Sequence, residues 1–383
     1  MEYKVCARCI TDTSVAAARF DENGECNYCK IHDRLDLHYP LTEKGEGRYK
    51  KLIEKIKAKG KNKKYDCVLG LSGGRDSIYS LYLAKQLGLR PLAVHFNDGF
   101  GNPVTGENMK KATEKLNIDL RIITSDWRES KDIKIAFLKA ATPDIEIGTD
   151  LGIASTLYGA ATKENVQFVI SGYSFRTEGI APLEWNYLDG KYLKSVHKRF
   201  GTIELRKWKP DDPGFNLSTF NIFYYTVIKR IQAIPLLCYV NYKLKEAGEI
   251  IGNELDWVYP GAKYYDDLYQ ALMTNIYRVK FNIDRRRFNY SALIRSGQMA
   301  REEALEKVEK NSVIEDPDVI SLCVKRLGIS QKDLEKYLAL PPRTFRDYPT
   351  SYNIIKYFRH PIKYFCKINL LPAVVYDKYF ECI

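Results

Sequence analysis

From Tyr65 onward the chain alternates short apolar runs with longer amphipathic ones, and this alternation constrains the fold more than any other feature of the sequence. Runs of strand length separated by helical stretches are typical of a parallel sheet with helical crossovers. The predicted strands are residues 65–71, 91–96, 120–124 and 167–171, and the predicted helices are 77–87, 107–116, 132–141 and 150–163. The sequence therefore predicts an α/β fold with a doubly wound parallel sheet of at least four strands, whose ligands bind beyond the carboxyl ends of the strands.

The segments on either side of this pattern differ from it in composition. Four of the nine cysteines lie in the first thirty residues, whereas the chain beyond about residue 241 becomes largely helical, with capped amphipathic patterns at 298–310 and 316–327. We therefore divide the 383 residues into a cysteine-rich module (1–40), a sheet domain (41–240) and a mostly helical region (241–383) that completes the substrate site.

Two pairs of cysteines have the spacing of a metal site. Cys6-x2-Cys9 and Cys26-x2-Cys29 are separated by sixteen residues, and Gly24 supplies a turn before the second pair. Each CxxC turn presents two thiolates to one tetrahedral ion, and this spacing is that of a four-cysteine zinc ribbon. Disulfides and a redox pair are the alternatives, and the cytoplasmic location that we expect argues against disulfides. Because four protein ligands leave no open position, we predict a structural zinc ion.

A glycine-rich loop directly follows the first predicted strand. Residues 72–77 read SGGRDS and lead into the first predicted helix. The two glycines let the backbone approach a ligand closely, and the amides at the start of a helix favour an anion. The hydroxyls of Ser72 and Ser77 can add hydrogen bonds. The loop matches neither the kinase and GTPase P-loop nor the dinucleotide fingerprint, so it predicts a different phosphate or pyrophosphate cradle.

SGGRDS resembles the SGG-x-DS signature of the PP-loop ATP pyrophosphatases, whose fold is adenine nucleotide alpha hydrolase-like. That resemblance implies that the loop holds the β and γ phosphates of ATP, which leave as pyrophosphate while AMP passes to a substrate oxygen. We expect Asp76 and Asp98 to contact Mg²⁺, since this ion uses one or two carboxylates plus substrate phosphates. The predicted nucleotide-binding residues are Ser72, Gly73, Gly74, Arg75, Asp76, Ser77, His95, Asn97, Asp98 and Gly172.

Two of these positions have a second interpretation. Arg75 occupies the variable position of the signature, where its guanidinium either reaches the phosphates or makes an outward salt bridge. His95 ends a predicted strand, and a histidine in that place is more often a packed polar residue than a catalyst. Both alternatives stay open at the level of the sequence.

Longer segments resemble the N-acetyl sugar amidotransferase family of surface polysaccharide biosynthesis. The matching segments run from Cys6 to about residue 304 and are CARCITDT, FDENGECNYCK, SGGRDS, ISGYSFRTEGIAPLEW, DWVYPGAKYYDDLYQ and KFNIDRRRFNYSALIRSGQMAREEA. Members of this family convert an acetamido group on a nucleotide-activated or nonulosonic sugar to an acetamidino group. The resemblance therefore implies an O-adenylyl intermediate that ammonia attacks with release of AMP, in the biosynthesis of lipopolysaccharide or O-antigen.

The same resemblance points to candidate catalytic residues beside Asp76. Arg176 and Glu178 follow the fourth predicted strand and are expected to bind substrate or support proton transfer, with a surface salt bridge as the alternative. Lys263, in the KYYDD cluster, is expected to hold phosphate or to stabilise the charge of the adenylation transition state. The three arginines at 285–287 are expected to hold the carboxylate or pyrophosphate of a charged sugar.

The expected partners follow from the source of the ammonia. No internal glutaminase is visible, because the residue after the initiator methionine is Glu2 rather than a nucleophilic cysteine. The resemblance implies that a glutaminase and a cyclase-like subunit supply the ammonia through a channel. Channelling suits this chemistry, since free ammonia at neutral pH is mostly ammonium, which has no lone pair. The helical region is expected to close the site or to make a contact in a homo-oligomer.

The net charge of +12, from 60 Lys+Arg against 48 Asp+Glu, indicates an anionic partner without choosing among them. It leaves a tRNA-modifying, thiolating PP-loop enzyme as the main alternative, whereas the leading interpretation includes no nucleic acid. Thiolating enzymes often need a redox cysteine pair near the loop, and the cysteines outside the quartet are not paired in sequence. A noncatalytic zinc-ribbon scaffold is a further alternative, against which the intact SGGRDS loop argues.

The amino-terminal sequence MEYKVCARC lacks the pattern of a secretion signal, so we expect a cytoplasmic protein. The stretch 213–228 is aromatic and nearly uncharged, but it is too short and too polar for the ~20 apolar residues of a bilayer span. We predict a buried helix there, and the alternative is a docking face formed by Phe220, Phe223, Tyr224 and Tyr225. The basic stretch 57–64 is predicted to be a solvated linker.

Overall fold

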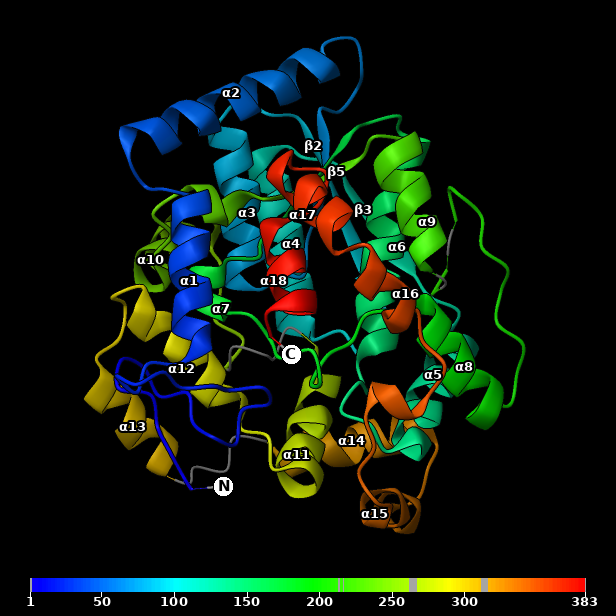
Figure 1. Ribbon diagram of the computed structural model, residues 1–383. Coiled ribbons are helices and arrows are strands. Elements are labelled where there is room, and N and C mark those ends of the chain that lie inside the picture. Colours follow the sequence, from blue (N-terminus) through cyan, green and yellow to red (C-terminus); the bar gives the residue numbers. More distant parts are fainter. Residues whose placement is uncertain (1, 213, 216, 262–266, 311–315, 383) are drawn as a thin grey trace.

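A five-stranded parallel sheet forms the centre of the chain (Figure 1). The computed structural model describes residues 2–212, 214–215, 217–261, 267–310 and 316–382. The strand order is β3-β2-β1-β4-β5, and each pair of neighbours is parallel. The strands are β1 (Cys67–Gly70), β2 (Pro91–Asn97), β3 (Leu120–Thr124), β4 (Phe168–Ser171) and β5 (Gln232–Pro235). Because β2 and β4 pair with opposite sides of β1, a topological switch point lies between β1 and β4.

Helices cover both faces of the sheet, as the burial of both faces of the strands requires. Along β1, Cys67 and Leu69 belong to one buried cluster and Val68 to the other. The first face packs against α2 (Glu43–Gly60), α3 (Arg75–Gln86), α4 (Pro103–Leu116) and α10 (Leu244–Leu255). The second face packs against α5 (Trp127–Ala140), α6 (Ile147–Lys163) and α8 (Gly190–Phe200). The predicted doubly wound α/β fold is thereby confirmed.

The chain beyond α10 is helical and returns across the sheet domain. Phe345 stacks on Tyr187 with ring centroids 4.2 Å apart, and the hydroxyl of Tyr348 donates to the carbonyl of Ala140 at 2.8 Å. The final segment, which carries no sequence motif, is thus packed against the sheet domain. This region comprises α11 (Tyr269–Phe281), α12 (Arg285–Arg295), α13 (Arg301–Glu309), α14 (Pro317–Leu327), α15 (Gln331–Ala339), η3 (Phe345–Asp347), α16 (Tyr352–Tyr357), α17 (Arg359–Lys367) and α18 (Ala373–Phe380).

Short elements connect these layers. The cysteine module leads into α1, and Figure 1 shows this amino-terminal segment lying beside α12 and α13. Within the described ranges no helix has both the length and the apolar character that a membrane crossing requires. The connecting elements are α1 (Asn27–His38), α7 (Phe175–Glu178), α9 (Thr219–Phe223), the π-helical turn η1 (Tyr224–Ile228) and η2 (Leu236–Tyr239).

The structure differs from the predicted elements at several boundaries. α3 begins at Arg75 rather than at Ser77, because Gly74 is its amino-terminal cap. The edge strand β5 is absent from the predicted set, since its four residues are few and include Pro235. Residues 57–60 end α2 instead of belonging to a solvated linker, and this difference corrects the interpretation of the basic stretch.

The prediction of a buried helix at 213–228 is wrong for one face of that segment. The side chain of Phe220 is 74% exposed and that of Phe223 is 46% exposed. On the other face Tyr225 is fully buried, and its ring stacks on Tyr158 of α6 with centroids 5.0 Å apart. The segment buries only the side that meets α6, which the sequence pattern does not reveal.

Gly73→Ala is expected to destabilise the fold, because Gly73 has φ 82° and an added Cβ would lie 2.2 Å from the carbonyl oxygen of Thr105. Left-handed backbone and overpacking together predict a loss of about 2 kcal/mol or more in the free energy of unfolding. Gly106→Ala, at a nearby α4 position whose Cβ meets nothing within 4 Å, is the matched control and should gain about 0.5 kcal/mol. Urea denaturation measures both, and equal stabilities would contradict the proposed geometry of the loop.

Candidate functional site

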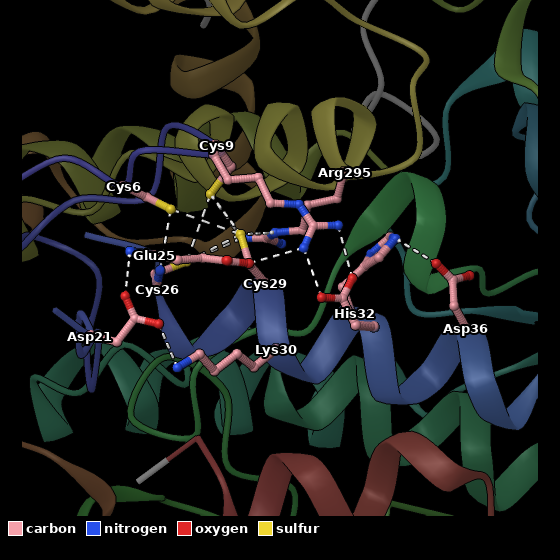
Figure 2. A network of polar contacts seen from close by, with 12 residues as sticks. Cys6, Cys9, Asp21, Glu25, Cys26, Cys29, Lys30, His32, Asp36 and Arg295 are labelled. Carbon is pink, nitrogen blue, oxygen red and sulfur yellow. Dashed lines mark hydrogen bonds and ion pairs between the residues drawn. The ribbon is translucent and has the colours of Figure 1, made fainter. Parts of the chain in front are cut away.

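Four cysteine sulfurs form a compact group in the amino-terminal module (Figure 2). Four sulfur–sulfur distances are 3.6 to 3.8 Å, and all four atoms lie within 4.8 Å of one another. Tetrahedral metal–sulfur bonds of about 2.3 Å place the sulfurs about 3.8 Å apart. Cys6, Cys9, Cys26 and Cys29 are fully buried and free of disulfides. The predicted quartet therefore fits one metal ion with four protein ligands.

Hydrogen-bond donors surround these sulfur atoms. Two backbone amides donate to the sulfurs of Cys6 and Cys9. Arg295 of α12 donates its Nε to Cys29 and a terminal nitrogen to Cys9, each at 3.3 Å, and Figure 2 shows the guanidinium beside the sulfurs. Because four thiolates around a divalent ion keep excess negative charge, a buried guanidinium is a matching counter-charge that also orients the ligands.

The cysteine module also supports the helices of the C-terminal region. Arg301 donates to the carbonyls of Cys9 and Cys6 at 3.1 and 3.0 Å. Arg287 pairs with Asp12 at 2.9 Å. These contacts join the module to both α12 and the start of α13. The module is therefore part of the structure that positions α12.

The SGGRDS loop joins β1 to α3 at the switch point. The hydroxyl of Ser77 accepts from the amide of Ser72 and donates to the carbonyl of Gly74, both at 3.1 Å. The amide of Gly74 donates to the hydroxyl of Ser72 at 3.3 Å. These bonds curl the loop over the start of α3, where the first amides have no acceptor within the helix. Such a helix start at the carboxyl edge of a parallel sheet can bind a phosphate group.

The loop lies against the end of β4 because Gly172 has no side chain. A Cβ at Gly172 would lie 2.9 Å from the carbonyl of Asp76 and 3.0 Å from the amide of Ser77. Any other residue would separate β4 from the start of α3. Gly172 therefore sets the position of the helix start, and it also lines the cavity described below.

Both charged side chains of the loop contact aromatic residues from beyond residue 240. The guanidinium of Arg75 lies over the rings of Trp257 and Tyr259, at 5.6 and 5.5 Å from their centroids. Oδ1 of Asp76 accepts a hydrogen bond from the hydroxyl of Tyr242. Among the ion pairs of the described residues none involves Arg75, so the outward salt bridge is not the arrangement found. Sequence reasoning missed these aromatic partners, which no local pattern marks.

A cavity of about 1120 Å³ opens beside the loop. Ligand pockets usually measure about 300–1,000 Å³, so the space suits a nucleotide together with a second substrate. The cavity is shared by the strand ends, the start of α6 and the C-terminal region. All predicted nucleotide-binding residues except Gly73 line it, namely Ser72, Gly74, Arg75, Asp76, Ser77, His95, Asn97, Asp98 and Gly172. Nucleotide binding itself stays a prediction.

The imidazole of His95 has a packing partner. Its Nδ1 lies 2.8 Å from the carbonyl oxygen of Leu71, so it donates across from β2 to the end of β1. Burial lowers the pKa of His95, which favours the neutral ring. This placement agrees with the interpretation of His95 as a packed polar residue rather than a catalyst. The ring also lines the cavity.

The carboxylates of Asp76 and Asp98 belong to different groups. Asp98 is buried and lies 2.8 Å from Nζ of Lys134, and its oxygens gather with those of Glu146 and Asp267. Within the described residues, Asp76 is not a member of a group of three or more potential metal ligands. Both carboxylates line the cavity, and the Mg²⁺ contacts that the sequence predicts for them stay a prediction.

The structure separates Arg176 from Glu178. Arg176 is buried, and its guanidinium donates to Asp36 of α1 and to two backbone carbonyls, one of them that of Cys238. These bonds hold α1 against α7, so the placement gives Arg176 a packing role outside the cavity. Glu178 lines the cavity and remains a candidate catalytic residue. Lys263 lies outside the described residues.

The three arginines at 285–287 point to different surroundings. Arg285 donates to Gln270 at 2.7 Å and lines the cavity. Arg286 also lines the cavity and pairs with Asp284 at 2.7 Å. Arg287 instead pairs with Asp12 of the cysteine module. Two of the three are therefore placed for the substrate contact that the sequence predicts.

The start of α6 contributes cavity residues that sequence reasoning missed. Glu146, Thr149 and Asp150 line the cavity opposite the C-terminal helices. The signal available in the sequence is three acidic residues within 144–150, placed in an otherwise small and apolar segment. Acidic side chains in a segment that must pack into a core are candidates for a site.

Asp144→Asn is expected to remove a pH dependence of stability. Oδ1 of Asp144 accepts the amide of Tyr187 at 2.6 Å, and burial raises the pKa of Asp144 to about 7 from its ordinary 3.8. A raised acid pKa means that the folded state keeps a proton which the unfolded state loses, so stability falls as pH rises from about 4 to about 7. Relative to wild type, the variant should gain about 1 kcal/mol or more between pH 5 and pH 8.

Urea denaturation at these two pH values measures the gain for Asp144→Asn. Asp211→Asn, at an exposed loop position, is the control and should follow wild type at both pH values. A constant difference between Asp144→Asn and wild type would refute the raised pKa.

Cys26→Ser is expected to abolish metal binding and to lower the free energy of unfolding by about 3 kcal/mol or more, because one of four ligands is lost. Cys366→Ser is the matched control, since the buried Cys366 sulfur lies outside the quartet and donates to the carbonyl of Pro372, which a serine hydroxyl can also do. Elemental analysis of the wild type should give one zinc ion per chain. Zinc retained in Cys26→Ser would contradict the assignment.

The comparisons with known proteins agree with these observations. Residues 262–361 match the family described as LPS biosynthesis protein WbpG-like, C-terminal domain. The uncharacterized protein MJ1599 of Methanocaldococcus jannaschii is 32% identical over 95 residues, which are 24% of this chain and 34% of that protein. The chain thus spans about a third of the length of this curated relative.

Three solved structures are similar at low identity. NH3-dependent NAD synthetase from Campylobacter jejuni shares 16% identity at a TM-score of 0.31, covering 78% of this chain and 98% of that chain. NMN synthetase from Francisella tularensis shares 16% at 0.33, covering 75% and 97%. U34-tRNA thiolase NcsA from Methanococcus maripaludis, with its [4Fe-4S] cluster, shares 12% at 0.32, covering 82% and 90%. TM-scores this low carry no argument about the site.

The family match and the loop geometry concern different parts of the chain. The match lies in the C-terminal region, whereas SGGRDS lies at the switch point of the sheet. The match supports the lipopolysaccharide-biosynthesis family predicted from the sequence: residues 262–361 are similar to the C-terminal domain of WbpG-like LPS biosynthesis proteins, and the sheet domain carries the SGGRDS loop.

Proposed function

We propose that the protein is an ATP-dependent amidotransferase that converts the acetamido group of an N-acetylated sugar to an acetamidino group for lipopolysaccharide biosynthesis. One observation carries the proposal: residues of the PP-loop and residues of the WbpG-like region line the same cavity, Ser77 and Arg285 among them. A nucleotide bound at the loop and a sugar bound against the C-terminal helices would therefore lie next to each other in the same cavity.

The first step would be adenylation of the acetamido oxygen. That oxygen attacks the α-phosphorus of ATP, a new P–O bond forms, and the bond to pyrophosphate breaks. The start of α3 and the hydroxyls of Ser72 and Ser77 would hold the departing pyrophosphate. Arg75, held at the cavity wall by two aromatic rings, would add positive charge as negative charge develops on the leaving group.

The second step would be displacement by ammonia. Ammonia adds to the imidate carbon, AMP leaves with the oxygen, and loss of a proton leaves the amidine. We assign acceptance of that proton to Glu178, the carboxylate at the end of α7 that lines the cavity. The ammonia would come from a glutaminase through a cyclase-like partner, which keeps it unprotonated until it reaches the imidate.

We further propose that the cysteine quartet binds zinc in a structural role. An iron–sulfur cluster interposes several atoms between its thiolates and holds them farther apart than a single ion does. The spacing of 3.6 to 3.8 Å between sulfurs favours the single ion. Zinc, when bound, would supply folding energy to the module that supports α12.

The proposed reaction is tested by incubating candidate N-acetylated sugar nucleotides with the protein, ATP, Mg²⁺ and an ammonium salt. We expect AMP and pyrophosphate, together with a sugar product about one dalton lighter because oxygen is exchanged for NH. Asp76→Asn should lower AMP formation about 10²-fold, since Asp76 lies in the proposed phosphate site. Mass spectrometry of the sugar and chromatography of the nucleotide give the two readouts.

Asp211→Asn, in an exposed loop, is the control and should keep wild-type activity. Stimulation of pyrophosphate release by total tRNA, with no effect of the sugars, would favour the thiolating enzyme and reject the sugar substrate. Equal AMP formation by wild type and Asp76→Asn would reject catalysis at the loop. That result is the one expected of a noncatalytic scaffold.

A further inference from the structure

Three carboxylates from distant parts of the chain meet in the wall of the cavity. Asp98 follows β2, Glu146 caps the start of α6, and Asp267 lies just before α11. One oxygen of each lies within 4.8 Å of the others. All three line the cavity, and none of them takes part in the hydrogen bond between Asp76 and Tyr242.

Backbone contacts hold two of these carboxylates in place. Oδ1 of Asp98 accepts the amide of Phe100 at 3.0 Å, and Oδ1 of Asp267 accepts the amide of Tyr269 at 2.7 Å. The two backbones are themselves joined, since the amide of Leu268 donates to the carbonyl of Phe100 at 2.9 Å. Oδ2 of Asp98 accepts the hydroxyl of Thr149 at 2.7 Å and pairs with Lys134 at 2.8 Å, so both oxygens of Asp98 are held in place.

One buried cation only partly offsets the negative charge. Nζ of Lys134 lies 2.8 Å from Asp98 and 3.6 Å from Glu146, and it also donates to Thr149 at 2.7 Å. Among the ion pairs of the described residues, these carboxylates meet no second ammonium or guanidinium. With all three carboxylates ionised, the cluster and the ammonium sum to −2, and such a charge is costly to bury without a counter-charge. Burial accordingly raises the pKa of Glu146 to about 7 and the pKa of Asp267 well above its ordinary value.

Glu146 marks where the missing partner belongs. Its residue exposure is 6%, yet neither of its carboxylate oxygens accepts a hydrogen bond. Its position as the cap of α6 does not explain this, because its side chain makes no capping bond to the helix. Buried carboxylate oxygens of this kind are rare unless a ligand, an ion or a water completes them.

We propose that Asp98, Glu146 and Asp267 bind one divalent cation that prefers hard oxygen ligands, Mg²⁺ or Mn²⁺, without the help of a nucleotide. The charge of such an ion equals the excess charge of the cluster, and carboxylate oxygens with water are its usual ligands. The ion would join Asp267 of the WbpG-like region to the sheet domain. The site differs from the Mg²⁺ contact predicted for Asp76, because it needs neither phosphates nor that carboxylate, and it assigns Asp98 to this second ion instead.

The test is titration of the full-length, zinc-loaded protein with Mn²⁺ in the absence of nucleotide, with free Mn²⁺ measured by electron paramagnetic resonance. We expect one bound Mn²⁺ per chain. Glu146→Gln should weaken binding about tenfold or more, because one anionic ligand is lost. Glu164→Gln is the matched control at the other end of α6, where Glu164 pairs with Arg121, and should bind Mn²⁺ like wild type.

Two further variants complete the test. Asp76→Asn should bind Mn²⁺ as wild type does, because the site does not include the proposed phosphate site. This result would hold whether or not the proposed amidotransferase reaction is correct. Asp267→Asn should weaken binding like Glu146→Gln, and it decides the matter if Glu146→Gln does not fold. Absence of Mn²⁺ binding by the nucleotide-free wild type, or wild-type affinity in the folded ligand variants, would overturn the proposal.

Discussion

The carbonyl oxygen of Gly73 is the atom on which the geometry of the site depends. It accepts hydrogen bonds from Asn108 of α4 at 3.3 Å and from the indole of Trp257 at 3.1 Å. The sheet domain and the later half of the chain therefore hold the same peptide of the PP-loop. Because Gly73 is in the left-handed region, its carbonyl can turn toward these donors while the following amides start α3. The cavity exists because both halves converge on this turn.

The cavity combines two electrostatic environments. On one side the start of α3 and Arg75 provide positive potential for phosphate groups. On the other side the acidic cluster, only partly offset by Lys134, attracts cations and donors of hydrogen bonds. The proposed reaction, which cleaves a triphosphate and then brings in an amine, would use both kinds of surroundings, and the two lie in one cavity.

The cysteine module contributes to this space indirectly. Arg295, whose guanidinium lies against the sulfurs, is the last residue of α12, and residues at the start of the same helix line the cavity. A change at the sulfurs would thus reach the cavity along a single rigid helix. A structural metal ion at the quartet, as proposed above, would therefore support the cavity without taking part in the reaction.

Features that are local in sequence could be predicted, whereas those that depend on distant contacts could not. The strand–SGGRDS–helix unit and the two CxxC pairs are complete within short segments, and the structure places each as expected. Arg176 shows the limit of such reasoning: it follows a strand end as predicted, but contacts with Asp36 turn it into a packing residue. The amphipathic face at Phe220 likewise could not be oriented without its neighbour α6.

The sequence by itself determined the class of fold, the glycine-rich turn before α3 and the cysteine quartet, because glycine conformation, helix starts and thiolate spacing act over a few bonds. Only the tertiary structure decided which residues share the cavity. Glu146 and Asp267 come from separate segments, and no periodicity relates them to Asp76 or Asp98. Their meeting is set by strand order and by the packing of α6 and α11 at the sheet edge, which are properties of the whole fold.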